Sequence, residues 1–448
     1  MCALIRIERG SLIGGKDMNK KLLMIFFLSS FVLCLGCNTS RLSTSSSSTQ
    51  GGGGDASNRF STTDTSVIFS IGNTVGVIDG QNIRIMVPFG TDLTTLIPTI
   101  TTSTNFSVSP ASGIAQDFTN PVIYTVTATD GSTKSYIVTA IVPSAGDKMA
   151  FAADGVIFNF AYVPGGLTFA TGDHSNTNPT VENAYWIAET VVTYQLWNTV
   201  YTWAIANGYT FANPGLKGSS GAGSVTQPVT NINWRDAIIF SNAITEWNNA
   251  KNGTNYDCVY YSDAAYTAPI RTSTDGDSCY TLGCEDRPYI RTDANGFRLL
   301  NDSEWELAAK YIGTTAPTAL PLATEANTTV IDGVTYYWTP DNYASGATAD
   351  FSDAAATSAV AWYGYNSGGT THDVKSNVPN QLGLYGMSGN VMQWTSELCS
   401  SGRGRLFRGG WGYPFIAEWQ AIFMDQYNYF GSSVKGGNLG LRLARTDF

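Results

Sequence analysis

Charged residues and histidine are scarce in this chain. Aspartate, glutamate, lysine and arginine make up only 13% of its 448 residues, and the two histidines are His174 and His372. Beyond Cys37 there is no Cys-x-x-Cys pair, so the ligand spacing typical of a structural zinc site is missing. The formal net charge is −10, and no basic run occurs outside the N-terminus. A nucleic-acid partner is therefore not expected, because such a partner requires a basic surface.

Glycine and aromatic residues, in contrast, are abundant. The chain has 46 glycines, 23 tyrosines and 11 tryptophans, and 43% of its residues are hydrophobic, which is ample for globular cores. Its length exceeds that of one ordinary domain, so we expect two or more domains. This composition is typical of turn-rich, exported folds more than of a cytosolic enzyme.

The N-terminal residues have the pattern of an export signal. Two lysines precede the apolar run 22–35, which is too short to span a membrane and fits the core of a signal peptide. The small residue Gly36 stands before Cys37, as in a lipobox, so we predict lipidation of Cys37 and display on a bacterial outer membrane. An ordinary signal peptide with an incidental Cys37 is the alternative. Met18 is the expected start of translation.

Four cysteines follow Cys37 in the chain: Cys258, Cys279, Cys284 and Cys399. An exported protein folds where disulfides form, so we expect one disulfide. Cys279 with either Cys284 or Cys258 is the expected pair, and sequence alone does not decide between them.

Changes in composition divide the chain into five segments. The second is rich in Ser, Thr and Gly and cannot build a core, which makes it a flexible tether. We predict an export signal, this tether, an all-β domain, a linker and an α+β domain, at residues 1–37, 38–59, 60–142, 143–155 and 156–446.

The all-β segment contains short runs in which apolar and polar residues alternate, as they do along half-buried strands. Asp130-Gly131 lies between the last two runs and predicts a hairpin, because glycine tolerates a positive φ. We expect a small sandwich of immunoglobulin-like or cadherin-like character that serves as a spacer.

Three helices are expected in the α+β segment. Residues 193–207 and 233–249 carry apolar side chains at helical spacing, and Asn233 is a good N-cap for the second of them. The third helix begins at Asn301, which can form a capping box with Glu304. The remainder is rich in Gly, Asn and aromatic residues and predicts short strands and loops.

Four ordered motifs in this segment carry a resemblance to a known family. They are Tyr162–Gly166, Leu300–Ala309, Asn380–Glu397, and the closing pair Arg408–Gly410 with Gly440–Arg442. In these motifs the chain resembles the formylglycine-generating, or sulfatase-modifying, enzymes. The resemblance implies a C-type-lectin-like fold for the α+β domain.

The family's chemistry does not follow from this resemblance. Its oxidases carry two cysteines between the closing motifs, where a thiolate pair binds copper, and this chain has no cysteine from Trp411 to Arg442. No catalytic residue is therefore expected. The family's calcium loop typically ends in Glu, where this chain has the neutral Gln393. Asn390 remains a candidate calcium ligand. For this loop, a buried polar network without metal is an alternative that the sequence supports equally.

A non-catalytic branch of the family fits better, namely bacterial variable lipoproteins that diversity-generating retroelements randomise near the C-terminus. The resemblance implies that residues 408–411 and 438–445 are framework and that the residues between them face a ligand. Aromatic residues mixed with small polar ones are typical of binding surfaces, although Phe and Trp are equally often core residues. The expected ligand-binding residues are Tyr413, Phe415, Trp419, Asp425, Tyr427, Tyr429, Phe430 and Ser432.

Three functions compete. The first is a surface lipoprotein that binds a protein or glycan without catalysis. The second is an enzyme of the sulfatase-modifying family or a relative that uses acid–base chemistry. The third is a structural envelope protein with the sandwich as its stalk. The candidate acid–base residues, which are more readily explained as capping and surface groups, are Glu304, Glu306, His372, Asp373 and Glu397.

Overall fold

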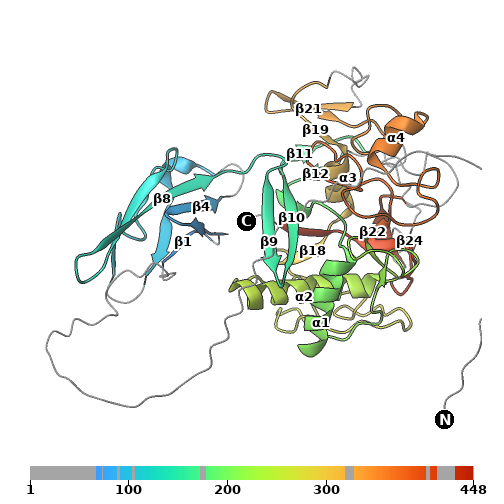
Figure 1. Ribbon diagram of the computed structural model, residues 1–448, viewed down its shortest axis with the longest axis horizontal. Helices are drawn as coiled ribbons and strands as arrows, with labels where there is room; N and C mark the ends of the chain where they lie inside the picture. The colour runs from blue at the N-terminus through green and yellow to red at the C-terminus, as the bar shows by residue number, and fades with distance from the viewer. Residues whose placement is uncertain are drawn as a thin grey trace, which may run out of the picture. The chain divides into compact units, whose positions relative to one another are not determined.

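The structure is a computed structural model and is drawn in Figure 1. It describes residues 67–72, 74–87, 91–102, 106–171, 178–317, 327–399, 404–410 and 429–446. The predicted export signal, the tether and Cys37 lie outside these residues, so their assignments stay predictions. No helix among the described residues is both long and apolar enough to cross a bilayer.

Two sheets form the N-terminal all-β part, as the alternating sequence pattern predicts. One sheet has the strand order β2-β1-β5 and the other has the order β3-β4-β8-β7-β6. The elements are β1 (Ile68–Ile71), β2 (Thr74–Val75), β3 (Val77–Asp79), β4 (Asn82–Met86), the 3-10 helix η2 (Leu93–Thr95), β5 (Pro98–Thr101), β6 (Ser107–Ser109), β7 (Val122–Thr127) and β8 (Thr133–Ile141).

Aromatic rings from different strands fill the core of this part. Phe69 of β1 contacts Tyr124 of β7 edge-on, with 5.2 Å between ring centroids. The predicted hairpin at Asp130-Gly131 joins β7 to β8, and Gly131 has a φ of 84°, as the turn requires. The predicted sandwich is therefore confirmed.

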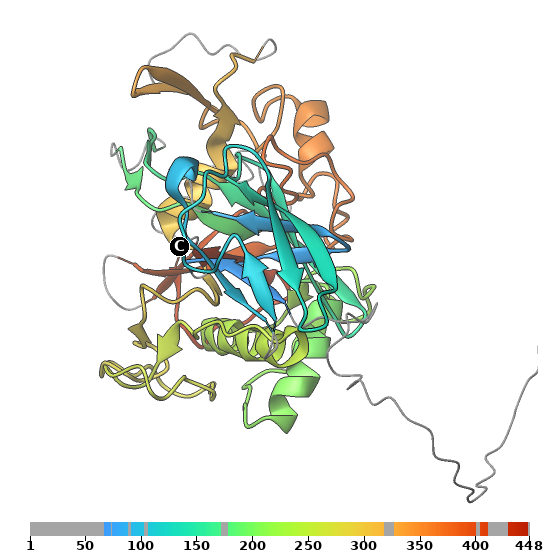
Figure 2. The same cartoon turned by 90° about the vertical axis from the view of Figure 1, so that its left-hand side faces the viewer.

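A five-stranded sheet organises the C-terminal part, in the order β18-β26-β13-β10-β9. Its strands alternate between two cores. Phe160 and Trp186 pack with α1 and α2, whereas Ala161 and Ile187 pack with α3, so both faces of the sheet are covered by helices (Figures 1 and 2). The strands are β9 (Lys148–Ala153), β10 (Val156–Val163), β13 (Tyr185–Ala188), β18 (Phe297–Leu299) and β26 (Leu443–Thr446).

One strand of this sheet lies in the stretch predicted as linker 143–155. Strand β9 pairs with β10 along six residues of each strand, from Val156 opposite Ala153 to Ala161 opposite Lys148. The turn between them is Asp154-Gly155, with φ values of 50° and 76°. This stretch is therefore part of the domain, because the Asp-Gly turn folds it back onto β10.

The three predicted helices are all present, and their caps explain where they begin. Thr193 caps α1 (Tyr194–Ala206), and Asn233 caps α2 (Trp234–Asn252) with a capping box to Asp236. Asn301 caps α3 (Asp302–Lys310): its side chain accepts from the Glu304 N–H at 2.8 Å, and the Glu304 carboxylate accepts from the Asn301 N–H at 2.9 Å. A fourth, short helix is α4 (Ala354–Val360).

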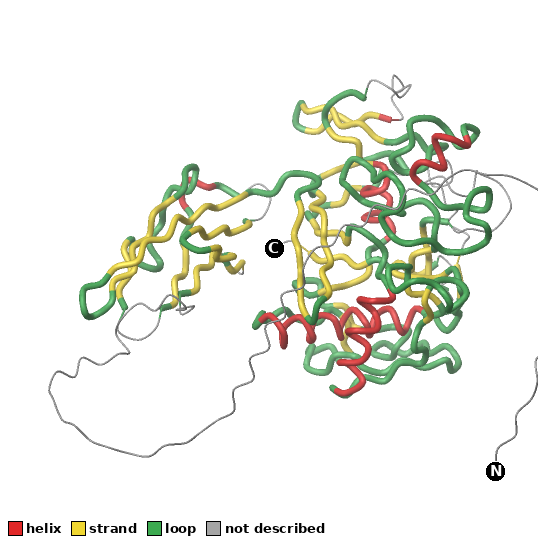
Figure 3. The backbone as a smooth tube through the Cα atoms, viewed as in Figure 1, coloured by secondary structure: helices red, strands yellow, loops and turns green. Residues whose placement is uncertain are grey.

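Most of the remaining chain is loop, as Figure 3 shows. Short sheets interrupt these loops. Their strands are β11 (Leu167–Thr168), β12 (Thr180–Val181), β14 (Leu216–Lys217), β15 (Val229–Thr230), β16 (Tyr260–Tyr261), β17 (Tyr289–Ile290), β19 (Tyr311–Gly313), β20 (Thr328–Ile331) and β21 (Val334–Trp338).

A four-stranded sheet near the C-terminus carries the closing motifs. Its order is β24-β23-β22-β25, with β22 and β25 parallel and the other pairs antiparallel. The strands are β22 (Met392–Leu398), β23 (Arg405–Arg408), β24 (Tyr429–Phe430) and β25 (Leu439–Leu441). The overall α+β class expected from the sequence is confirmed.

Candidate ligand-binding site

Paired strands hold the ends of the predicted ligand-facing stretch side by side. The chain enters the stretch from β23 and leaves it through β24, and Arg405 pairs with Phe430 while Leu406 pairs with Tyr429. The stretch thus starts and ends on one sheet. Five of the eight predicted ligand residues lie outside the described residues, namely Tyr413, Phe415, Trp419, Asp425 and Tyr427.

The other predicted ligand residues lie at the base of the stretch. Tyr429 lies in β24. Phe430 is half-buried, and its ring stacks on Phe407 with 4.8 Å between centroids. Ser432 is buried, and its carbonyl accepts from the Trp234 N–H at 3.1 Å. Phe430 and Ser432 therefore have packing roles, and ligand contact by all eight residues stays a prediction.

Arg408 anchors the first closing motif to helix α3. Its Nε donates to one oxygen of Asp302 at 2.6 Å, and its terminal nitrogen donates to the other at 2.5 Å. The same terminal nitrogen lies 3.4 Å from the Glu306 carboxylate. A bidentate arginine–carboxylate pair is strong and directional, so it holds the end of β23 in one position.

Arg442 anchors the second closing motif and is fully buried. Its Nε donates to Gln393 Oε1 at 2.8 Å, and its other nitrogens donate to the carbonyls of Ala188 at 2.7 Å and Tyr385 at 2.6 Å. Burial lowers the pKa of Arg442 to about 9, and the charge of Glu189 raises it in part. The guanidinium thus lies among neutral oxygens, and its N–H groups hold several segments together.

Gln393 completes this network at the position where the family typically has Glu. Its Oε1 also accepts from Trp305 Nε1 at 3.0 Å, and its Nε2 donates to the Gly386 carbonyl at 2.8 Å. The amide supplies both a donor and an acceptor here, whereas an ionised carboxylate has no donor for the carbonyl. Gln393 is thus suited to a hydrogen-bonded core.

Asn390 is the candidate calcium ligand, and its amide is engaged with one neighbouring residue. Its Oδ1 accepts from the His372 N–H at 3.0 Å, and its Nδ2 donates to the His372 carbonyl at 3.0 Å. The part of the chain that the structure describes contains no cluster of three or more His, Cys, Asp or Glu side chains. The Asn390 amide therefore takes part in a polar network, and calcium binding at Asn390 stays a prediction.

We expect calcium and chelators to leave the melting temperature of the protein unchanged. A ligand that binds only the folded state raises stability in proportion to the logarithm of its concentration over Kd, so a real site gives a concentration-dependent shift. Thermal unfolding with EDTA, and then with increasing calcium, measures this directly. A rise in the melting temperature with calcium, but not with magnesium, would show that the folded protein binds calcium and would support Asn390 as a ligand.

The disulfide is Cys279–Cys284, one of the two pairings considered from the sequence. Cys258 and Cys399 are buried elsewhere. Burial raises the pKa of Cys258 far above its ordinary value, so its thiol stays protonated and unreactive. The disulfide closes a short loop that lies beside the C-terminal sheet.

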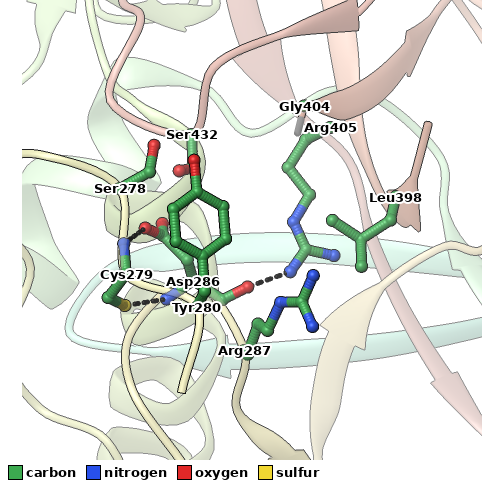
Figure 4. Close-up of a pocket in the computed structure, with 9 residues that line it drawn as sticks. All are labelled: Ser278, Cys279, Tyr280, Asp286, Arg287, Leu398, Gly404, Arg405 and Ser432. Atoms are coloured by element: carbon green, nitrogen blue, oxygen red, sulfur yellow. Dashed lines mark hydrogen bonds between the residues drawn. The ribbon is translucent and has the colours of Figure 1, made fainter. Parts of the chain in front are cut away.

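A small pocket lies between this loop and the C-terminal sheet (Figure 4). Its volume of about 20 Å³ is close to that of a single water site, so it is no cavity for an organic ligand. Its lining residues are Ser278, Cys279, Tyr280, Asp286, Arg287, Leu398, Gly404, Arg405 and Ser432.

Asp286 and Arg405 connect the walls of this pocket. Arg405 donates to the Asp286 carbonyl and to the Ser396 carbonyl, the latter at 2.6 Å, and its guanidinium lies 3.6 Å from the centre of the Trp234 ring. Burial lowers the pKa of Arg405 to about 10. The Asp286 carboxylate accepts from the Cys279 N–H at 2.8 Å, which ties the disulfide loop to the same point.

Exposed apolar side chains surround the pocket mouth. Tyr280 is 60% exposed and Leu282 is 57% exposed, both inside the disulfide loop, and Leu398 of β22 is exposed beside them. The Arg287 guanidinium lies 5.9 Å from the centre of the Tyr280 ring. Tyrosine and arginine are enriched among the residues that dominate binding energy. Sequence reasoning missed this loop because it lies more than a hundred residues before the closing motifs.

Four of the five candidate acid–base residues have structural partners. Both oxygens of Glu304 accept from Arg298 at 2.7 Å, and His372 stacks on Trp362 with 3.7 Å between centroids. Asp373 accepts from Ser224, Glu306 faces Arg408, and Glu397 is exposed on β22. The described residues place no two of these groups in a nucleophile–base arrangement, and the assigned capping role of Glu304 is confirmed.

Both parts of the chain match known family models. Residues 66–140 match the family model "SGBP, N-terminal", and residues 154–447 match "Sulfatase-modifying factor enzyme 1-like domain". The "Chaperone protein LppX" of Paenibacillus barcinonensis is 26% identical over 298 residues, which cover 63% of this chain and 87% of that protein.

Two solved structures are also similar. Treponema denticola variable protein 1 is 25% identical with a TM-score of 0.48, covering 66% of this chain and 98% of its own. PvdO from Pseudomonas aeruginosa is 17% identical with a TM-score of 0.41, and the match covers 68% of this chain and 100% of PvdO. The family match spans well over half of the chain and contains all four closing and internal motifs. The chain therefore belongs to the family of the sulfatase-modifying factor enzyme 1-like domain.

Proposed function

We propose that this chain is an exported lipoprotein that binds a protein or glycan through its C-terminal lectin-fold surface, without catalysis. The observation that carries the proposal is the stretch 411–442, which lacks the cysteine pair of the family's oxidases. Cys37 would carry the lipid, and the tether 38–59 would hold the folded domains away from a bacterial outer membrane. A membrane anchor and a ligand are thus the expected partners.

The framework around the stretch supports binding. Arg408 fixes one end through Asp302, and Arg442 fixes the other through Gln393 and backbone carbonyls. A stretch mounted on a rigid framework can change its side chains without changing the fold, which is how binding loops on stable scaffolds work. The Paenibacillus relative is named a chaperone, and a chaperone's ligand is a protein, which favours a protein ligand here.

We expect substitution of the predicted contact residues to weaken binding while the protein stays folded. The test uses the full chain with Cys37→Ser, on arrays of glycans and of purified extracellular proteins. Replacing Tyr413, Tyr427 and Tyr429 with Ser removes aromatic contact area and lowers affinity for any bound probe by on the order of tenfold or more. Tyr365→Ser is the matched control, because Tyr365 is an exposed tyrosine outside the stretch.

Two outcomes contradict the proposal. Unchanged binding by the triple variant favours a structural envelope protein, or binding elsewhere on the chain. Copper-dependent oxidation of a thiol peptide by the purified protein favours an enzyme.

Retroelement diversification has a separate test: a DNA copy of the region coding for residues 408–445 that differs at adenines should lie beside the gene. Its absence leaves a binding protein of fixed sequence.

A further inference from the structure

A second and larger cavity lies on a different part of the lectin-fold domain. Its volume is about 180 Å³, and its walls come from the start of β10, the turn from β13 into α1, and residues 374–375. An apolar cavity of about 150 Å³ accommodates benzene, so this one has room for a ring-sized organic molecule. None of its lining residues belongs to the stretch 411–442 or to the disulfide loop.

One side of this cavity is apolar. Phe158 of β10 and Leu196 of α1 line it together with Val192 and Leu443, and the last three are buried. Binding pockets for small molecules combine such an apolar wall with a few polar groups that fix orientation. The charged groups that line this cavity are Glu189 and Lys375.

Together with Lys148, which lies next to the cavity, Glu189 and Lys375 carry more positive than negative charge. The Glu189 carboxylate forms ion pairs with Lys375, which lines the cavity, and at 3.6 Å with Lys148, which lies behind the cavity wall and also donates to two backbone carbonyls. Two ammonium groups therefore contact one carboxylate. Burial lowers the pKa of Lys148, and the charges of Lys375 and Arg442 lower it further, while Glu189 raises it. A local excess of positive charge in a chain of net charge −10 favours an anionic ligand.

Lys375 is the group placed to meet that ligand. It lines the cavity, and its side chain is 44% exposed to solvent. An ammonium has three N–H donors, and the ion pair with Glu189 engages one side of it. Lys375 also has a φ of 63°, a left-handed conformation that lysine rarely adopts and that is often found at ligand sites.

The N-terminus of α1 supplies no competing anion site. The Tyr194 N–H donates to the Gln227 carbonyl at 2.8 Å, and the Gln195 N–H donates to the Val225 carbonyl at 2.8 Å. The Leu196 N–H donates to the Thr193 hydroxyl at 3.2 Å. Recognition of charge in this cavity therefore depends on the lysine side chain and not on the helix.

We propose that this cavity binds a small monocarboxylate with a compact apolar body, with the carboxylate on Lys375 and the body against Phe158 and Leu196. The site is independent of the C-terminal surface, so it stands whether or not that surface binds a ligand. Benzoate matches the size, charge and apolar character that the cavity requires, and it serves as the probe.

The experiment compares three probes of similar shape, benzoate, benzyl alcohol and benzylamine, by ligand-observed NMR titration of the full chain carrying Cys37→Ser. Benzoate is expected to bind on the order of tenfold more tightly than the alcohol, because it gains a charge-assisted hydrogen bond, and benzylamine is expected not to bind. Equal binding of benzoate and benzyl alcohol would overturn the proposal, as would no binding of benzoate.

Two variants locate the site. Lys375→Asn removes the ammonium and keeps a residue that tolerates positive φ, so we expect it to weaken benzoate by about tenfold. Lys435→Asn is the matched control, since Lys435 is an exposed lysine paired with Asp275, and should leave benzoate binding unchanged. Val192→Phe should fill the cavity and exclude all three probes. If Val192→Phe does not fold, the comparison of Lys375→Asn with Lys435→Asn still tests the site. Equal benzoate affinity in these two variants contradicts the proposal that Lys375 binds the carboxylate.

Discussion

Replacing Arg442 with Met is expected to lower the free energy of unfolding by about 3–5 kcal/mol, because several buried acceptors lose their donor together. The Arg442 guanidinium donates to Gln393 and to the carbonyls of Ala188, Tyr385 and Gly386, at distances of 2.6–3.1 Å. Arg442 is fully buried. Methionine fills much of the volume and supplies no N–H group. Each unsatisfied buried acceptor costs about 1–3 kcal/mol, and relief from burying a charge offsets part of the sum.

Arg445→Met is the matched control for this change. Arg445 lies three residues later, is less buried, and donates from Nε to the Asn295 carbonyl at 2.6 Å while its guanidinium lies over the Tyr256 ring. We expect a loss of about 1 kcal/mol. Denaturant unfolding of both variants gives the comparison. Equal losses of unfolding free energy would show that the Arg442 network stabilises the protein no more than the half-buried Arg445 does.

The helices and the sandwich could be predicted because their signals are local. Asn301 and Glu304 are three residues apart, and the capping box needs nothing beyond that spacing. Asp130-Gly131 likewise marks its hairpin without help from the rest of the fold. The same dipeptide at 154–155 predicts the β9–β10 hairpin, and the strand was missed because Lys148–Ala153 is short, alanine-rich and flanked by linker-like residues.

The contacts of the site could be predicted only in part, because they join distant segments. Gln393 and Arg442 both lie in motifs of the family, yet their hydrogen bond spans 49 residues, and neither motif indicates the partner. The Arg408–Asp302 pair spans 106 residues. Tyr280 reaches the same face from a disulfide loop that no motif of the family marks. Sequence periodicity identifies elements, whereas these contacts depend on how the elements pack.

The second large effect is expected from Asp286→Asn, which removes one charge and almost no volume. Arg235 is fully buried, and its Nε and one terminal nitrogen each donate to Asp286 at 2.7 Å. Breaking a buried pair leaves an uncompensated charge, which costs about 3–5 kcal/mol. Glu285, with an oxygen 3.0 Å from the Arg235 guanidinium, keeps part of the compensation, so the lower end of this range is expected.

The same substitution should change the acid response of the protein. Burial alone raises the pKa of Asp286, but hydrogen bonds from Arg235, Ser432 and the Cys279 N–H outweigh it, and the pKa lies below its ordinary 3.8. The unfolded chain therefore holds the proton more tightly than the folded one. The stabilisation from the ionised Asp286 carboxylate is complete above pH 3.8, the ordinary pKa of the group. It is lost as the pH falls through the lower pKa of the folded state. The stability difference between wild type and variant should narrow in that acid range.

Denaturant unfolding at neutral and acidic pH measures both effects, with Asp293→Asn as the matched control. Asp293 pairs with Arg291 at 3.2 Å, but its side chain is 73% exposed, so its loss should change stability little at any pH. A stability difference for Asp286→Asn that stays constant on acidification would mean that the charge is not what holds Arg235. Because the Asp286 carboxylate also accepts from the Cys279 N–H, the variant should loosen the disulfide loop, which forms one wall of the pocket beside β23. If that wall contributes to binding, affinity for any ligand of the C-terminal surface will fall with stability, whereas the benzoate affinity of the distant cavity will not change.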